Sequence, residues 1–410
     1  MDKILRERAE TIISASIKAV QPDDAVRRAL DGQNFTGRIL LVSAGKAAWQ
    51  MAKAAYDCLG DRIDDGVVVT KYDHVMGPIA NFTCCEAGHP VPDENSFAGT
   101  QKALDLVADL SAEDTVLFLL SGGGSALFEK PLVSGEVLQD ITGQLLACGA
   151  DIVEINTIRK RLSAVKGGRF ALACAPAQVF SVVLSDILGD PLDMIASGPA
   201  AADTSTCEQA IAIADKYQLK LTAEARALLR QETPKELNNV TTQITGSVRE
   251  LCTAAANACH ELGYEPVVLT DQLCCQAREA GSFLASVLKT YGSTGKKMAF
   301  IAGGETVVQL IGKGKGGRNQ ELALSAAAGI AGIPGAAVFS VGSDGTDGPT
   351  DAAGGYSDYE TAAELKAQGI EIYQVLQNND AYHALQRCGG LIITGPTGTN
   401  VNDVAVALLG

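Results

Sequence analysis

The chain has 410 residues, which at roughly 100–200 residues per domain is enough for two domains and excludes a single small module. Hydrophobic residues make up 47% of the sequence and charged residues 20%, so a disordered, collagen-like or coiled-coil protein is excluded. The formal net charge of −15 argues against a nucleic-acid-binding protein, because that role needs a basic surface that displaces phosphate counterions.

The first predicted elements are a helical segment over residues 3–30 and a strand in the sequence ILLVSAGK at 39–46. Lys46 follows this strand directly and opens a helix, so its ammonium is expected beside unpaired backbone N–H groups, where an anion binds. The segment is not a Walker A loop, because Leu40 stands where that motif has glycine and Ala47 where it has serine or threonine. From these residues alone, a surface lysine at a helix start is an equally good interpretation.

Glycine is frequent, with 43 residues, and much of it follows short β-branched runs. A strand followed by a glycine loop recurs in five segments, at 39–46, 116–126, 299–306, 337–348 and 391–400. Between them, helical periodicity appears at 47–59, 97–110, 247–262 and 319–329. This alternation predicts an α/β protein with mainly parallel, helix-covered sheets, in which ligands bind beyond the carboxyl ends of the strands.

The most specific of these loops is Ser121-Gly122-Gly123-Gly124-Ser125, which follows the apolar strand at 116–120. Three consecutive glycines let the backbone approach a phosphate closely, and the two hydroxyls add donors. We therefore predict that this loop binds a phosphate group.

A dense basic stretch follows at 156–169. Lys160 and Arg161 are expected on a solvated helix face. Lys166, followed by Gly167 and Gly168, has instead the composition of an anion-binding loop.

Acidic residues cluster after two predicted strands: Asp186, Asp190 and Asp193 after the first, and Asp344, Asp347 and Asp351 after the second. Carboxylates at strand ends beside phosphate-binding glycines suit Mg²⁺, which takes one or two carboxylates together with phosphate oxygens. Most of these residues are better interpreted as turn formers that bond to their own backbone. Asp186 is the exception because it directly follows an apolar run, and Asp190 is the second candidate for a metal ligand.

The polar stretch QETPKELNN at 231–239 separates two strand–helix series. It predicts an N-terminal domain over 1–236 and a C-terminal domain over 237–410, with the strand at 240–246 opening the second series. The helical segment 1–30 is compatible with packing on either domain.

The loop Gly312–Glu321 concentrates three cations before a helix, where an anionic substrate of this acidic protein would be attracted: Lys313, Lys315 and Arg318. The loop also matches the dinucleotide fingerprint G-x-G-x-x-G. We reject a dinucleotide site there, because no Asp or Glu lies between Glu321 and Asp344 to hold the ribose.

The eleven cysteines are odd in number and include no Cys-x-x-Cys pair, so we expect reduced thiols in a cytoplasmic protein. The four histidines include no i, i+4 pair, which argues against a zinc site. The charged first residues, MDKILRERAETIISAS, are unlike a signal peptide, and no apolar run is long enough to span a membrane.

Taken together, these motifs resemble the glycerate 2-kinases whose C-terminal part is called the MOFRL domain. The matching segments lie in the same order along nearly the whole chain: SAGKAA (43–48), AGHPVPDENS (87–96), LLSGGGSAL (119–127), IRKRLSAVKGGR (158–169), LSDILGDPLDMIASGP (184–199), GGET (303–306), GKGGRNQELAL (314–324), SDGTDGPTDAAGG (343–355), NND (378–380) and TGPTGTNVND (394–403).

The resemblance implies a Rossmann-like N-terminal domain and a MOFRL-type α/β domain around a cleft, and an ATP- and Mg²⁺-dependent kinase of the 2-hydroxyl of D-glycerate. It carries over Lys46 and Arg318 as the cations of that cleft. On this hypothesis Ser121–Ser125 and Lys166 bind the ATP phosphates, Asp186 holds Mg²⁺ or takes the hydroxyl proton, and Lys46 and Arg318 stabilise the transferred group. The oligomeric state stays open, a homodimer being one option.

Two alternatives belong to other classes. Relatives of this family have been labelled hydroxypyruvate reductases, but the predicted strand at 66–70 ends in Lys71 where an NAD enzyme would place its ribose-binding acid. A non-catalytic module that binds a small organic acid would also show basic loops, without a need for ATP.

Overall fold

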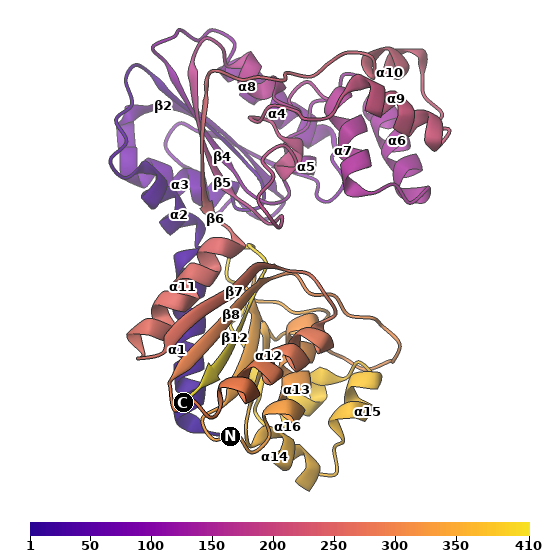
Figure 1. The fold of residues 1–410 in the computed structure, drawn as a ribbon. Helices are drawn as coiled ribbons and strands as arrows, with labels where there is room; N and C mark the ends of the chain where they lie inside the picture. Colours follow the sequence, from indigo (N-terminus) through magenta and orange to yellow (C-terminus); the bar gives the residue numbers. More distant parts are fainter. The chain divides into compact units, whose positions relative to one another are not determined.

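The computed structural model describes residues 1–410 and divides them into two compact units (Figure 1). We call Pro22–Thr245 the first unit, and Met1–Gln21 together with Gly246–Gly410 the second unit. The segment expected to be helical over 3–30 therefore forms one helix in each: α1 (Lys3–Ala19) in the second unit and α2 (Pro22–Leu30) in the first. Asp2 caps α1 by accepting from the amides of Ile4 and Leu5, and a proline opens α2, where its missing N–H costs nothing.

The first unit is built on a six-stranded sheet in the order β3-β2-β1-β4-β5-β6. The pairs from β3 to β5 are parallel, and β1 and β4 are buried along their whole length. The strands are β1 (Ile39–Ala44), β2 (Ile63–Lys71), β3 (Thr83–Ala87), β4 (Thr115–Leu120), β5 (Gln178–Leu184) and β6 (Val240–Gly246). This is the strand order of dinucleotide-type α/β folds. Strands are added toward one edge of the sheet up to β3 and toward the other edge from β4, so the strand order reverses between β1 and β4.

Helices cover both faces of this sheet. Side chains of α2 and α3 (Ala48–Leu59) pack on one face around Met51, and those of α4 (Glu94–Leu106), α5 (Gly124–Leu127) and α8 (Arg169–Ala173) on the other around Phe118. A separate apolar cluster unites α6 (Gly135–Ala147), α7 (Ile152–Arg161), α9 (Cys207–Lys216) and α10 (Ala223–Leu228).

The strand over 240–246 lies elsewhere than the sequence pattern suggests. Instead of opening the C-terminal domain it forms β6 at the edge of the first sheet, next to β5, where the amide of Val179 donates to the carbonyl of Asn239. The polar stretch at 231–239 thus lies inside the first unit, and the division falls near residue 245, not 236. Polar composition marks an exposed connection, but strand pairing decides which unit a connection belongs to.

The second unit contains a mixed sheet in the order β11-β10-β9-β12-β8-β7. β7 and β8 are parallel, whereas β12 runs antiparallel to both of its neighbours, β8 and β9, and β10 runs antiparallel to β9 and β11. The strands are β7 (Glu265–Leu273), β8 (Met298–Gly304), β9 (Ala337–Gly342), β10 (Gly354–Asp358), β11 (Leu391–Ile392) and β12 (Asp403–Leu409). The predicted α/β class is confirmed, and these antiparallel pairs are what the alternating pattern does not reveal.

In the second unit α1 lies beside α11 (Val248–Glu261), as Figure 1 shows. Side chains of α12 (Ala277–Tyr291) and α13 (Arg318–Ile330) form a core with Phe300, Val338 and Ala407 of the sheet. Three short helices complete the unit: α14 (Thr361–Ala367), α15 (Ile372–Gln377) and α16 (Ala381–Arg387). No helix of the chain combines the length and apolar character needed to cross a bilayer, and all eleven cysteines are unpaired.

Candidate functional site

Two loops of the first unit meet where its strand order reverses, at the carboxyl ends of β1 and β4. The amide of Lys46 donates to the carbonyl of Gly122 over 2.9 Å, and the amide of Ala47 donates to Oγ of Ser121 over 3.1 Å. Gly45 makes this approach possible: its φ is 125°, and a Cβ there would lie 2.2 Å from Oγ of Ser121. The structure therefore brings the loop at Gly45–Ala47 and the triple-glycine loop Ser121–Ser125 together at the position where α/β sheets bind ligands.

Three polar side chains lie around the triple-glycine loop. A Cβ on Gly122 would lie 2.3 Å from Oδ2 of Asp186, and one on Gly123 would lie 3.0 Å from Cγ of Lys46 and 3.2 Å from Nε2 of His89. Lys46 is half-buried and forms no ion pair, so its charge is available to an anion. A carboxylate, an ammonium and an imidazole thus lie against two adjacent glycines.

Asp186 and His89 line one pocket of the first unit together with the two glycines, and Lys46 lies against Gly123 outside the lining residues. Among the predicted residues, Gly122, Gly123, Ser125 and Asp186 lie on its wall, and the remaining lining residues are His89, Pro90, Ala126, Ile152, Asn156, Ile187, Met194 and Ala196. Ser121 and Gly124 do not line the pocket but support the residues that do. The hydroxyl of Ser121 accepts from Ala47, and Gly124 packs so closely that a Cβ there would lie 2.7 Å from Cβ of Ala196.

His89 is the pocket residue that sequence reasoning did not select. It follows β3 at the carboxyl edge of the sheet. Its place directly after Gly88, in the segment AGHPVPDENS, is the sequence signal that could have indicated this position. Burial lowers the pKa of His89 below its ordinary value, and the positive charges of Lys46 and Lys71 lower it further. The imidazole is therefore neutral at physiological pH, and it can donate or accept a hydrogen bond in the pocket.

One wall of the pocket is a turn with unusual backbone geometry. Ala196, Ser197 and Gly198 all have positive φ, at 50°, 62° and 66°. The two non-glycine residues cost roughly 1–3 kcal/mol each in this conformation, so the surrounding contacts must stabilise it. Such strain is typical of functional sites, and here it places Ala196 against Gly124.

Lys166 does not reach the pocket, contrary to the prediction that it binds cofactor. Its side chain is fully buried, and Nζ donates to the carbonyls of Ser125 and Phe128 over 3.0 Å each, beside Glu129 at 3.5 Å. Burial lowers the pKa of Lys166 to about 8. The residue holds the end of the triple-glycine loop from behind.

The prediction of a solvated helix face for Lys160 and Arg161 is wrong. Their side chains are 2% and 0% exposed. Sequence reasoning missed this because the partners, Asp203 and Ser205, are more than forty residues away in the chain.

The pocket offers hard oxygen donors of the kind Mg²⁺ prefers, and Asp186 contributes the carboxylate on its wall. Asp190 lies outside the lining residues and occupies a turn with φ 53°, although its Oδ1 is buried without a hydrogen-bond partner. The residues present therefore fit a magnesium ion through Asp186. Asp190, which does not line the pocket, is not placed to bind that ion directly.

In the second unit, Arg318 is held by two carboxylates. Nε and Nη2 donate to Asp403 over 2.5 and 3.0 Å, and Nη1 donates to Glu305 over 2.7 Å. Burial opposes the charge, but the hydrogen bonds and the fields of Asp403 and Glu305 raise the pKa of Arg318. The guanidinium is held in one orientation and is fully charged. Its charge is compensated by Asp403 and Glu305, whereas Lys46 forms no ion pair.

The loop before Arg318 is anchored, which gives a structural reason to reject the dinucleotide fingerprint. Cβ atoms on Gly312 and Gly314 would lie 2.2 and 2.6 Å from the carbonyl oxygen of Asn378, and the amide of Gly314 donates to that carbonyl. The ammonium of Lys315 lies 4.2 Å from the ring centroid of Tyr382. These glycines serve close packing against residues 378–380.

Asp347 caps α13 from a distant loop. Its carboxylate accepts from the amides of Asn319 and Gln320 over 3.1 and 2.9 Å, and a Cβ on Gly317 would lie 2.2 Å from its Cγ. Burial raises the pKa of Asp347 to about 6, and the charge of Asp403 adds to this, although the hydrogen bonds of Gln320 and Asn319 oppose it. Asp347 therefore holds the start of a distant helix, instead of bonding to its own backbone as the turn-former interpretation expects.

Replacing Asp347 with asparagine is expected to stabilise the protein at neutral pH. An acid whose pKa rises from 3.8 to about 6 on folding contributes stability below pH 3.8 that is lost as the pH rises through about 6. The loss is on the order of 2–3 kcal/mol at neutral pH, and the neutral amide avoids it. Urea unfolding of both proteins from about pH 4 to pH 7 should show the variant's advantage growing with pH; a constant difference would contradict the assignment.

Comparison with known proteins shows the family of the chain. The chain matches two family models, the domain of unknown function DUF4147 over residues 8–230 and the MOFRL family over 298–403. It is 53% identical to a D-glycerate 2-kinase from Thermotoga maritima, over 99% of this chain and 98% of that protein. The chain belongs to the glycerate 2-kinase family.

Two further relatives describe the range of this glycerate 2-kinase family. The crystal structure of glycerate kinase from Thermotoga maritima matches with a TM-score of 0.96 and 53% identity, covering 100% of each chain. A relative from Agrobacterium vitis, named as a hydroxypyruvate reductase, is 38% identical over 100% of this chain and 95% of that protein. The first family model includes Lys46 and Asp186, and the MOFRL model includes Arg318 and Asp403.

Proposed function

We propose that this protein is an ATP-dependent glycerate 2-kinase, which transfers the γ-phosphoryl group of ATP to the 2-hydroxyl of D-glycerate and releases ADP and 2-phosphoglycerate. The observation that carries the proposal is a pocket at the sheet's switch point whose wall contains Asp186 and two adjacent glycines, with Lys46 against the second glycine. Phosphoryl transfer needs positioning and charge compensation more than covalent help from the protein. The family membership and the full-length similarity to a D-glycerate 2-kinase support the same reaction.

Each pocket group has a role in this proposal. Gly122 and Gly123 admit the phosphates close to the backbone, because side chains there would collide with Asp186, Lys46 and His89. The unpaired ammonium of Lys46 compensates charge on the transferred group. Asp186 either holds Mg²⁺ or accepts the hydroxyl proton. When bound, Mg²⁺ would neutralise phosphate charge and orient the phosphate oxygens.

The test is an end-point assay with ATP, Mg²⁺ and D-glycerate, in which phosphorus NMR separates 2-phosphoglycerate from 3-phosphoglycerate. We expect 2-phosphoglycerate together with an equal amount of ADP. Absence of ADP would contradict the kinase proposal for this substrate. A parallel assay with NADH and hydroxypyruvate tests the reductase alternative. Against it, Gly312 and Gly314 of the G-x-G-x-x-G match pack on residues 378–380, and Gly317 packs on Asp347.

Replacing Gly122 with alanine is expected to lower kcat/KM roughly 10- to 100-fold, because the new Cβ would displace the carboxylate of Asp186. Gly143 is the matched control. It lies in α6 with open space around it, so Gly143→Ala should leave kcat/KM unchanged and stabilise the helix by about 0.5–1 kcal/mol. Equal activities of the two variants would show that the Gly122–Asp186 contact does not matter for turnover.

A further inference from the structure

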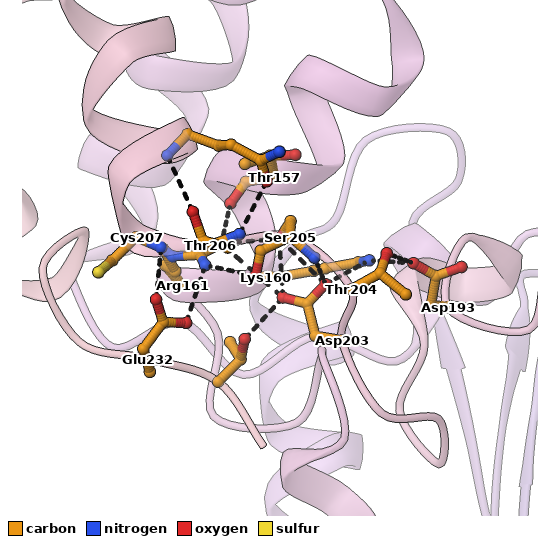
Figure 2. A network of polar contacts seen from close by, with 12 residues as sticks. Thr157, Lys160, Arg161, Asp193, Asp203, Thr204, Ser205, Thr206, Cys207 and Glu232 are labelled. Atoms are coloured by element: carbon orange, nitrogen blue, oxygen red, sulfur yellow. Dashed lines mark hydrogen bonds and ion pairs between the residues drawn. The ribbon is translucent and has the colours of Figure 1, made fainter. Parts of the chain in front are cut away.

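Lys160 is a buried cation outside the pocket. It lies on α7, one turn beyond the pocket residue Asn156, and its side chain is only 2% exposed. Its Nζ donates to Oδ1 of Asp203 over 2.9 Å and to Oδ2 of Asp193 over 3.2 Å (Figure 2). A buried ammonium is costly unless it is paired, so these two carboxylates fix its position.

The two carboxylates differ in how firmly they are held. Asp203 accepts hydrogen bonds from the amide and hydroxyl of Ser205 and, over 2.7 Å, from the hydroxyl of Thr233. Asp193 is partly exposed, and apart from Lys160 its carboxylate accepts only from the hydroxyl of Thr204, over 2.8 Å. As Figure 2 shows, Lys160 lies between these carboxylates and ties the loosely held Asp193 to the firmly held Asp203.

Asp193 is the start of the strained pocket wall. Met194 and Ala196, which follow it, both line the pocket, and a Cβ on Gly198 would lie 2.9 Å from the backbone of Asp193. The same helix holds the turn at a second point, since the hydroxyl of Ser197 donates to the side-chain carbonyl of Asn156 over 2.8 Å. α7 therefore restrains this turn at both ends.

We propose that Lys160 is a positioning residue, which through Asp193 holds the turn Met194–Gly198 in the place where it forms one wall of the pocket. This inference builds on the proposed function. Lys160 lies outside the lining residues of the pocket. Its effect passes through the turn to Ala196, which meets the triple-glycine loop at Gly124. A displacement of about 1 Å at a reacting centre can cost 100-fold in rate, so the tie matters for turnover.

The test uses Asp193, because truncating the buried Lys160 would leave Asp203 uncompensated and endanger folding. Asp193→Ala breaks the tie, Asp193→Asn keeps an acceptor for Lys160 and Thr204, and Asp215→Ala removes an exposed partner of Arg226 in the same unit as the control. We expect Asp193→Ala to lower kcat about 10- to 100-fold while its melting temperature stays close to that of wild type. Asp193→Asn should have a kcat within about threefold of wild type. The control should leave both kcat and the melting temperature unchanged.

Hydrogen–deuterium exchange gives a readout that does not depend on activity. Peptides covering 194–201 should exchange faster in Asp193→Ala than in wild type or Asp193→Asn. Unchanged kcat per folded molecule with unchanged exchange would overturn the proposal while leaving the proposed function intact. If wild-type protein forms no 2-phosphoglycerate, the proposed function fails, and the exchange comparison alone decides whether the tie holds the turn.

Discussion

Lys46→Met is expected to lower kcat/KM for ATP-dependent phosphorylation of D-glycerate by roughly 10²- to 10³-fold, the cost of losing one preorganised charge at a transferred group. Lys46 forms no ion pair and lies beside the pocket residue Gly123, whereas other lysines of the unit, such as Lys160 and Lys166, are neutralised by buried partners. Methionine keeps the length of the side chain and removes only the charge. Steady-state kinetics with both substrates would measure the effect.

The matched control is Lys53→Met, which removes an exposed lysine of the helix that follows Lys46 and should change kcat/KM less than twofold. An independent readout is the imidazole of His89. Since Lys46 is one cause of its lowered pKa, after burial, that pKa should rise toward 6.5 in Lys46→Met, as followed by NMR titration. A variant with wild-type kinetics and a raised His89 pKa would confirm that Lys46 lies near His89 but remove it from the mechanism.

Arg318→Ala is expected to reduce turnover by roughly 10³-fold, if this arginine stabilises the transferred phosphoryl group as arginine fingers do. Its bidentate contact with Asp403 and its bond to Glu305 hold the guanidinium in one orientation. Arg318→Lys keeps the charge but loses the fork geometry, so its turnover should lie between that of wild type and that of the alanine variant.

A structural role for Arg318 makes a different prediction. Removing it leaves Asp403 as a nearly buried carboxylate without its cation, which destabilises the fold. Melting temperatures and the folded fraction must therefore accompany the kinetics. If the alanine variant is less stable but turns over normally per folded molecule, Arg318 serves the second unit's packing and not phosphoryl transfer.

Local chemistry explains why some of the predicted site residues lie on the pocket wall. The run of three glycines after an apolar strand, and Asp186 directly after another, mark pocket residues because short-range patterns place them at strand ends. Asn156 lacked such a signal, since no local pattern on its helix separates a pocket residue from a packed one. Lys160 was expected on a solvated face and Lys166 at a phosphate, because a basic stretch suggests contact with solvent or an anion. Both are buried against distant carboxylates, which the local sequence does not reveal.

By itself, the sequence determined the α/β class, the helices and strands with strong periodicity, and the glycine loops that follow them. Only the tertiary structure decided that β4 pairs with β1, and this pairing places Ser121–Ser125 against Lys46. The tertiary structure also decided that β6 joins the first sheet and that β12 lies antiparallel to its neighbours in the second sheet. The physical reason is that periodicity and turn chemistry act over a few residues, whereas strand order and side-chain burial depend on partners tens to hundreds of residues away.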